Sequence, residues 1–138
     1  PLARSGHRIF IDKNFMYLVG GYTNNPEQTI LREMWRLNLV TCRWTKLAVP
    51  TQFPVALASF TCNTNGEGSF LIYGGTGLPF GLHLDDSIYL GLVKEDKVFI
   101  KQLMPKGDKV GCYGHSMAYD KKQDVYYCIG GTDGQNFR

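Results

Sequence analysis

The sequence lacks the features that mark membrane, secreted and nucleic-acid-binding proteins. Its apolar runs, such as 70–73 and 125–129, fall far short of the roughly 20 residues of a membrane helix. No signal peptide is visible in it, and it contains no Asn-x-Ser/Thr glycosylation site. The 15 Lys and Arg residues nearly balance 12 Asp and Glu residues, and a net charge of +3 is too small to indicate nucleic-acid binding. We therefore expect a cytoplasmic protein, with the nucleus as an open alternative, and neither a membrane nor nucleic acid as partner.

Cysteine is present, but not in a metal-binding pattern. No two of Cys42, Cys62, Cys112 and Cys128 form a Cys-x-x-Cys pair, and the three histidines are dispersed. The count of four leaves two disulfides open, but nothing else indicates secretion. We expect reduced, mostly buried thiols in an intracellular protein. No metal and no cofactor is expected.

Motifs for common enzyme classes are also missing. The glycine-rich segment 75–81 has no Gly-Lys-Ser/Thr and no helix after it, so it does not predict a phosphate loop. No Gly-x-Ser-x-Gly nucleophile elbow occurs. Cys112, Tyr113 and His115 offer the ligand types of a copper oxidase site, but the start of a strand is expected to splay them apart. We predict a non-enzymatic protein.

Glycine and aromatic residues are abundant. There are 16 glycines, eight Phe, eight Tyr and two Trp, which favours an all-β chain with tight turns. Glycine pairs recur about every 55 residues, and each follows an apolar run and, before it, a polar turn and another β-type stretch. The sequence therefore predicts a repeated β-hairpin whose second strands are 15–19, 69–73 and 125–129.

The second half of each unit recurs as well. Trp35 and Tyr89 are matched in the third strands of two units, and Trp44 and Phe99 in the fourth. Leu57 is matched to a position that is glycine in the other units, Gly6 and Gly114. No segment has a sustained 3.6-residue period, so helix content should be near zero. Units are expected at 1–49, 54–104 and 112–138, the last stopping after its first hairpin.

This repeat resembles the kelch repeat, which builds β-propellers. The resemblance implies an all-β kelch propeller fragment of about two and a half four-stranded blades. Propellers typically close with four to eight blades. We therefore expect an excerpt of a longer propeller, and the alternative is a short product that assembles with other copies.

Two families of loops are expected at one end of the blades, before each first strand and after each glycine pair. Loops on a rigid scaffold usually carry function. Arginine suits carboxylates and aromatic rings suit apolar groups, a mixture that fits a peptide. His7 and His115 stand at corresponding positions and are expected to be structural. The candidate peptide-binding residues are Arg4, Ser5, Tyr22, Asn24, Arg32, Thr76, Lys109 and Tyr113.

Three stretches, 3–7, 31–35 and 74–81, are similar to a group of kelch proteins that act as substrate receptors of cullin-2 RING ubiquitin ligases. The resemblance implies that the propeller captures client C-terminal peptides (C-degrons). It also implies elongin B and C and cullin-2 as partners, through a region not in this chain. By this resemblance Arg4 and Ser5 are the best candidates to hold a peptide acid. The alternative is a structural kelch scaffold that binds actin or another protein through its outer surface.

Overall fold

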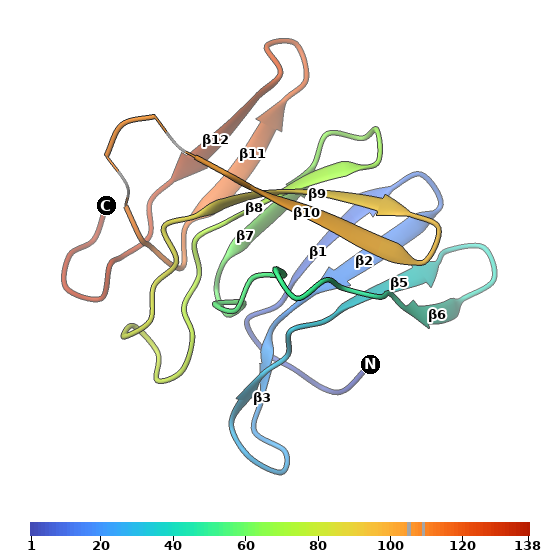
Figure 1. The fold of residues 1–138 in the computed structure, drawn as a ribbon, viewed down its shortest axis with the longest axis horizontal. Helices are drawn as coiled ribbons and strands as arrows, with labels where there is room; N and C mark the ends of the chain where they lie inside the picture. Colours follow the sequence, from blue (N-terminus) through green and yellow to red (C-terminus); the bar gives the residue numbers. More distant parts are fainter. Residues whose placement is uncertain (105, 109) are drawn as a thin grey trace.

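The computed structural model describes the whole chain apart from residues 105 and 109. These described residues form β-strands, turns and loops, and no helix (Figure 1). Accordingly, none of them belongs to a helix that could cross a membrane. The all-β prediction is confirmed.

The first four-stranded sheet runs in the order β1-β2-β5-β6, and each strand is antiparallel to its neighbour. Its second strand is the apolar run before the first glycine pair, as the sequence predicted. The long loop between its second and third strands carries the short ribbon of β3 (Tyr22–Thr23) and β4 (Thr29–Ile30). The sheet strands are β1 (Arg8–Asp12), β2 (Phe15–Val19), β5 (Met34–Asn38) and β6 (Arg43–Lys46).

The second sheet repeats this meander, and a third hairpin follows. The second sheet has the order β7-β8-β9-β10, again antiparallel throughout. The innermost strands β1, β7 and β11 contact one another in sequence, so the sheets fan out from a common centre (Figure 1). This is the predicted arrangement of two four-stranded blades and the first half of a third. The strands are β7 (Thr61–Thr64), β8 (Ser69–Tyr73), β9 (Ile88–Lys94), β10 (Lys97–Leu103), β11 (Ser116–Asp120) and β12 (Val125–Ile129).

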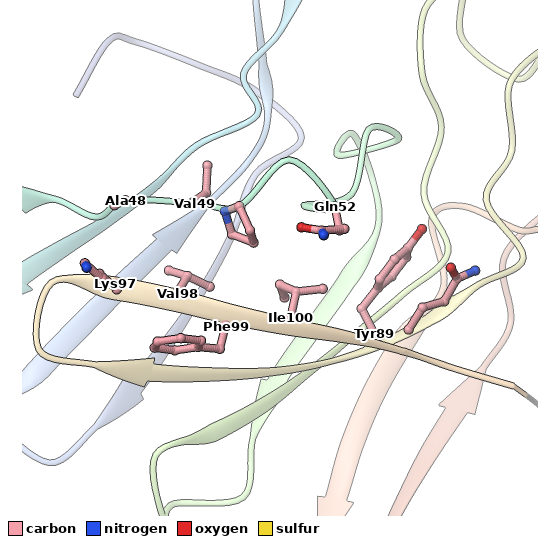
Figure 2. A pocket seen from close by; sticks show the side chains of 10 residues that line it. Ala48, Val49, Gln52, Tyr89, Lys97, Val98, Phe99 and Ile100 are labelled. Carbon is pink, nitrogen blue, oxygen red and sulfur yellow. The ribbon is translucent and has the colours of Figure 1, made fainter.

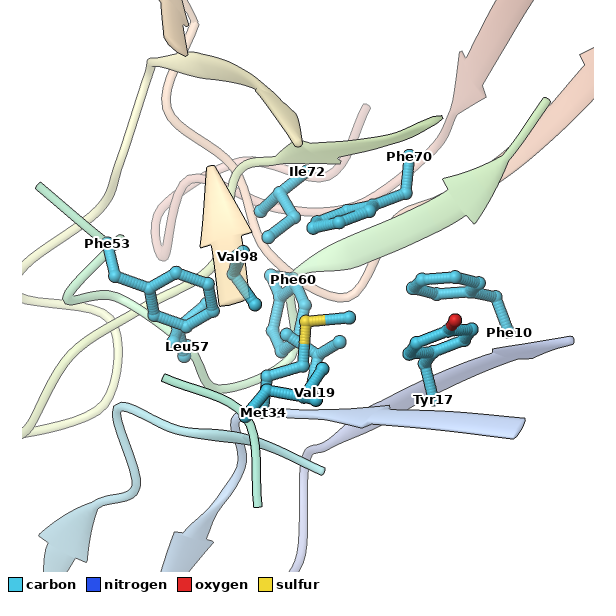
Figure 3. Packing of buried hydrophobic residues seen from close by; sticks show 11 residues of the cluster. Phe10, Tyr17, Val19, Met34, Phe53, Leu57, Phe60, Phe70, Ile72 and Val98 are labelled. Atoms are coloured by element: carbon cyan, nitrogen blue, oxygen red, sulfur yellow. The ribbon is translucent and has the colours of Figure 1, made fainter. Parts of the chain in front are cut away.

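The main core lies between the first two sheets (Figure 3). The ring of Phe10 stacks on Tyr17 at 4.8 Å and on Phe70, across the junction, at 5.2 Å between centroids. Met34 and Phe60 are fully buried beside them. Burying each large apolar side chain contributes about 1.5–3 kcal/mol, so the stability of one blade depends on the next.

The glycine pairs also hold neighbouring blades together. The backbone N–H of Gly21 donates to the carbonyl oxygen of Leu57 at 2.7 Å, and Ser59 N–H donates to Gly6 at 3.0 Å. At Gly20, φ is +61°, and an added Cβ would lie 2.7 Å from Leu57 Cβ. Only glycine accepts both the left-handed backbone and this close approach.

The same two hydrogen bonds recur at the next junction. Gly75 N–H donates to Cys112 and Gly114 N–H donates to Ser59, both at 2.8 Å. The recurrence shows that Ser59, with φ +54°, is the counterpart of Gly6 and Gly114. The predicted match of Leu57 to these glycines is therefore wrong by two residues.

A second correspondence is wrong by one residue. Trp44 pairs with Leu37, and the equivalent pair in the second blade is Ile100 with Gly91. Phe99 is thus one position away from the counterpart of Trp44, and it points to the other face, where it is 52% exposed. The turn between β9 and β10 is shorter than the turn between β5 and β6, and both strands of the second blade are longer. Matching the two blades by sequence position therefore placed Phe99 one residue away from the true counterpart of Trp44.

The cysteines differ from expectation in exposure. All four are free thiols, but Cys42 and Cys128 are exposed, Cys62 is half-buried and Cys112 is buried. The prediction of mostly buried thiols is wrong for Cys42, which lies in the turn before β6, and for Cys128, which lies on the outer strand of the third hairpin.

Candidate functional site

The loops that follow the glycine pairs meet the segments that precede the first strands, as the sequence predicted. In each blade, the residue three positions before the start of the first strand bridges to the residue just after the glycine pair. These short bridges bring both loop families to one end of the molecule, opposite the hairpin turns (Figure 1). The bridged pairs are Ser5 with Tyr22, Ala58 with Thr76, and Tyr113 with Thr132.

The loop of the second blade lies between those of its neighbours. The ring of Phe80 packs edge-on against Tyr22 of the first blade, with centroids 5.0 Å apart. On the other side, a Cβ added to Gly81 would lie 3.3 Å from the hydroxyl of Tyr113 in the third blade. Phe80 remains 39% exposed. Partly exposed aromatic side chains from all three blades therefore lie along this end, and we call them the mouth (Tyr22, Phe80, Tyr113).

Four predicted site residues line one depression beside the mouth. Its volume is about 360 Å³, and the four residues in its wall are Arg4, Ser5, Tyr22 and Asn24. Ser5 and Asn24 are exposed, so their polar groups are open to a ligand. The structure thus brings together part of the predicted set.

Thr76 is buried and organises the loop. Its Oγ1 donates to the carbonyl of Gly77 at 3.0 Å and accepts from Gly81 N–H at 2.9 Å. The side chain has no exposed surface. Thr76 therefore shapes the segment that presents Phe80 and does not itself face the mouth.

Arg4 is held in an ion pair. Its Nη2 lies 2.7 Å from Oε1 of Glu33, and its other nitrogens donate to the carbonyls of Leu2 and Gly20. The Arg4 side chain is 3% exposed. Glu33 also accepts from Lys46 at 2.6 Å. All of these partners belong to the protein itself, and the side chain of Arg4 is buried.

The contacts of Glu33 explain why the pKa of its carboxyl group is unusually low. Burial acts to raise the pKa of Glu33, but hydrogen bonds from Lys46, Trp35 and Arg4 outweigh burial and lower this pKa to about 2. Glu33 is therefore ionised at neutral pH and ties the first loop to β5 and β6.

Arg32 also serves the scaffold. Its Nε donates to the carbonyl of Pro54 at 3.2 Å, and its Nη2 donates to those of Thr51 and Phe53. These bonds hold the linker between the first two blades. The remaining candidate, Lys109, lies outside the described residues.

A second cavity, missed by sequence reasoning, lies on the central side of the molecule. It measures about 310 Å³ and is lined at the starts of β1, β7 and β11. Arg8, Thr61 and Ser116 are the opening residues of these strands and hold equivalent positions in the three blades. The sequence holds one signal for this cavity, because Arg8, Thr61 and Ser116 each stand two residues after the equivalent Gly6, Ser59 and Gly114. We call this cavity the central cavity; Cys62, His115 and Met117 complete its lining.

A buried polar cluster adjoins the central cavity. His115 Nε2 lies 2.7 Å from Thr61 Oγ1, and its Nδ1 lies 3.5 Å from the sulfur of Cys112. Burial lowers the pKa of His115 and raises that of the Cys112 thiol, so both groups are neutral at pH 7. The structure brings Cys112 and His115 together, contrary to the expected splaying, but Tyr113 turns to the mouth. Within the described residues, no group of three His, Cys, Asp or Glu side chains is arranged to hold a metal ion.

A third cavity lies at the outer edge of the second blade (Figure 2). It measures about 480 Å³ and is bounded by the linker at Ala48 and Val49 and by β10 at Val98 and Ile100. Ala48 pairs in parallel with Lys97, so the linker extends the sheet at one end and leaves the rest of β10 open. Exposed Phe99 lies on this edge.

The repeated four-stranded meander, its radial arrangement and its glycine-pair junctions define a protein of the β-propeller class. The family model for the Kelch motif matches residues 3–48. The chain is a kelch-repeat protein, as its sequence predicted.

Similarity to full proteins extends over nearly the whole chain. It is 33% identical over 144 residues to Kelch domain-containing protein 10 of Xenopus tropicalis, covering 97% of this chain and 34% of that protein. The human protein of that name is 32% identical, with 97% and 31% covered. The Drosophila melanogaster homolog is 31% identical over 153 residues, with 99% and 24% covered. The chain thus spans about a third or less of these relatives, and the similarity supports a kelch module of the protein-binding kind.

Proposed function

We propose that this chain is part of a kelch propeller that serves as the substrate-recognition subunit of a cullin-2 RING ubiquitin ligase and captures the C-terminal peptides of client proteins. The similarity to Kelch domain-containing protein 10 and the resemblance of 74–81 to receptors of this class support the proposal. Elongin B and C and cullin-2 are the proposed ligase partners, through another part of the protein. Ubiquitin transfer would belong to those subunits, so the chain itself has no catalytic role in this proposal. The cytoplasm is the proposed location, with the nucleus as the alternative.

The observation that carries this proposal is the convergence of three blades at the mouth. Tyr22, Phe80 and Tyr113 offer apolar contact, and the adjacent Ser5 and Asn24 offer hydrogen bonds. An extended peptide needs both kinds of contact along its length, because its backbone is polar while many side chains are apolar. Three blades that share one rim provide both without any catalytic group.

The test is binding of the purified protein to peptides that are identical except for a free or an amidated C-terminus. We expect the free form to bind at least ten-fold more tightly, since charge-assisted hydrogen bonds to the carboxylate are lost on amidation. Equal binding of the two forms, or none, would remove the proposal.

A matched pair of variants locates the peptide on the protein. Phe80→Ser removes an exposed aromatic ring from the mouth, and Phe99→Ser removes one from the outer edge. Peptide affinity should fall in Phe80→Ser and stay unchanged in Phe99→Ser. The reverse pattern would contradict a site at the mouth.

The third cavity, at the outer edge of the second blade, favours a second candidate function. In this alternative the chain is a structural scaffold that binds actin or another protein through its outer surface. The open part of β10 and the exposed Phe99 are the observations that favour it. Co-sedimentation with actin filaments tests the actin case. A protein that stays in the supernatant at all filament concentrations would remove it, and Phe99→Ser should reduce any pelleting observed.

A further inference from the structure

The guanidinium of Arg8 differs from most others in the described part of the chain. Arg4, Arg36 and Arg138 each pair with a carboxylate. No described carboxylate lies within ion-pair distance of Arg8, whose side chain makes one hydrogen bond, from Nη1 to the carbonyl of His7 at 3.0 Å. The side chain is only partly exposed and lines the central cavity. A half-buried cation without an acid partner is costly, which makes this position an attractive one for an incoming anion.

None of the other residues that line the central cavity carries a charge that could neutralise the guanidinium of Arg8. No Asp or Glu lines the central cavity. Burial raises the pKa of the Cys62 thiol and lowers that of His115, so both are neutral at pH 7. Burial also lowers the pKa of Arg8, but a guanidinium starts so high that it stays charged. The central cavity therefore carries a single, positive charge.

One further donor faces the same space. Ser116 is exposed and makes no side-chain hydrogen bond to described residues, whereas the hydroxyl of Thr61 is engaged with Tyr73 and His115. Arg8 and Ser116 come from equivalent positions of the first and third blades, with Thr61 between them. A guanidinium and a hydroxyl across one cavity match the acceptor oxygens of a carboxylate.

We propose that Arg8 and Ser116 form an anion subsite in the central cavity that binds a carboxylate of a peptide held at the mouth. The identity of the ligand as a peptide rests on the proposed function, while the anion subsite rests on the geometry of Arg8. The carboxylate comes either from the peptide's C-terminus or from an acidic side chain. Both sources present the same group to Arg8.

Peptide binding by two matched arginine variants tests the subsite. Arg8→Gln removes the charge in the central cavity, and Arg43→Gln removes one from an exposed outer strand, where Arg43 makes no side-chain hydrogen bond to described residues. We expect at least ten-fold weaker binding for Arg8→Gln, no change for Arg43→Gln, and melting temperatures like the parent protein's. If Arg8→Gln does not fold, Arg8→Lys is the second variant, because lysine keeps the positive charge but lacks the paired N–H donors of the guanidinium. Arg8→Lys should bind the peptide several-fold more weakly than the parent protein.

Three peptides of equal length distinguish the carboxylate sources: one with a free C-terminus, one amidated, and one amidated that ends in Asp. An Arg8→Gln effect confined to the first peptide assigns the terminal carboxylate, and an effect on the third assigns a side chain. Either result supports the subsite. Unchanged affinities of Arg8→Gln for every peptide that the parent protein binds would overturn it.

A parent protein that binds no peptide would remove the proposed function and leave the subsite to a second measurement. The probe is then N-acetylglycine, with its amide as control, monitored at the side-chain Nε resonance of Arg8. A saturable shift with the acid and none with the amide supports the subsite. No shift with either compound in that case overturns it.

Discussion

Oγ1 of Thr61 lies 2.7 Å from Nε2 of His115, and this contact joins β7 to the residue just before β11 inside the protein. The Thr61 hydroxyl donates to the carbonyl of Tyr73 at 3.2 Å, so it accepts from the Nε2 proton of His115. Nδ1 is then free to accept from the thiol of Cys112. A chain of polar contacts thus crosses the junction beside the central cavity.

Replacing Thr61 with valine should destabilise the protein by about 1–2 kcal/mol, because Nε2 of His115 loses its buried partner. Urea unfolding measures the change. Thr45→Val on β6 is the control, since Thr45 makes no side-chain hydrogen bond to described residues, and it should change the free energy of unfolding by less than about 0.5 kcal/mol. Equal effects of the two substitutions would argue against a stabilising role for the contact.

Gly74→Ala should be far more harmful than Gly66→Ala. Both glycines have positive φ, at +67° and +79°, so both alanines carry the left-handed penalty of about 1–2 kcal/mol. Only at Gly74 would the new Cβ lie 2.5 Å from the carbonyl of Cys112 and from the ring of His115; at Gly66 nothing lies within 4 Å. We expect an additional loss of about 2 kcal/mol or more for Gly74→Ala in urea unfolding. Similar losses would contradict a packed junction.

Ser59→Gly should stabilise the protein. Ser59 has φ +54°, in a position that is glycine in the other two blades. Relief of the left-handed strain outweighs the greater entropy of glycine in the unfolded chain, for a net gain of about 0.5–1 kcal/mol. Ser59→Ala is the control, because it removes the hydroxyl but keeps the strain, and it should bring no gain. A gain in the alanine variant would locate the effect in the hydroxyl and not in the backbone.

Glu33→Gln should lower stability at neutral pH and abolish part of its acid dependence. The folded-state pKa of Glu33 is about 2, below its usual 4.5, so its contribution is fully present above about pH 4.5 and is lost as pH falls towards 2. We expect the variant to be about 2–3 kcal/mol less stable at pH 7, with Arg4 left unpaired, and the difference to shrink below pH 4.5. Urea unfolding at a series of pH values measures this.

Glu67→Gln is the matched control for the pH series, because Glu67 is exposed in a turn and forms no ion pair with described residues. Its stability should follow that of the parent protein at every pH. A Glu33→Gln curve that runs parallel to the parent curve down to pH 2 would show that Glu33 does not titrate as described.

The strands were predictable because their signals are local. The runs 15–19, 69–73 and 125–129 are the observed β2, β8 and β12. The errors arose where equivalence depended on turn length, as with Phe99 and Trp44, since one residue more or less reverses the face of a strand. Exposure of Cys128 could not be read from its apolar strand, because burial requires a neighbouring surface.

The sequence by itself determined the repeat, the antiparallel blades and the glycine junctions, because alternation along strands and the need for positive φ are properties of a few adjacent residues. Only the tertiary structure decided what each polar side chain does. Arg4 forms an ion pair with Glu33, 29 residues away, whereas Arg8 has no described acid beside it. The central cavity exists only where the first strands of three blades converge, and such convergence depends on contacts between residues far apart in the chain.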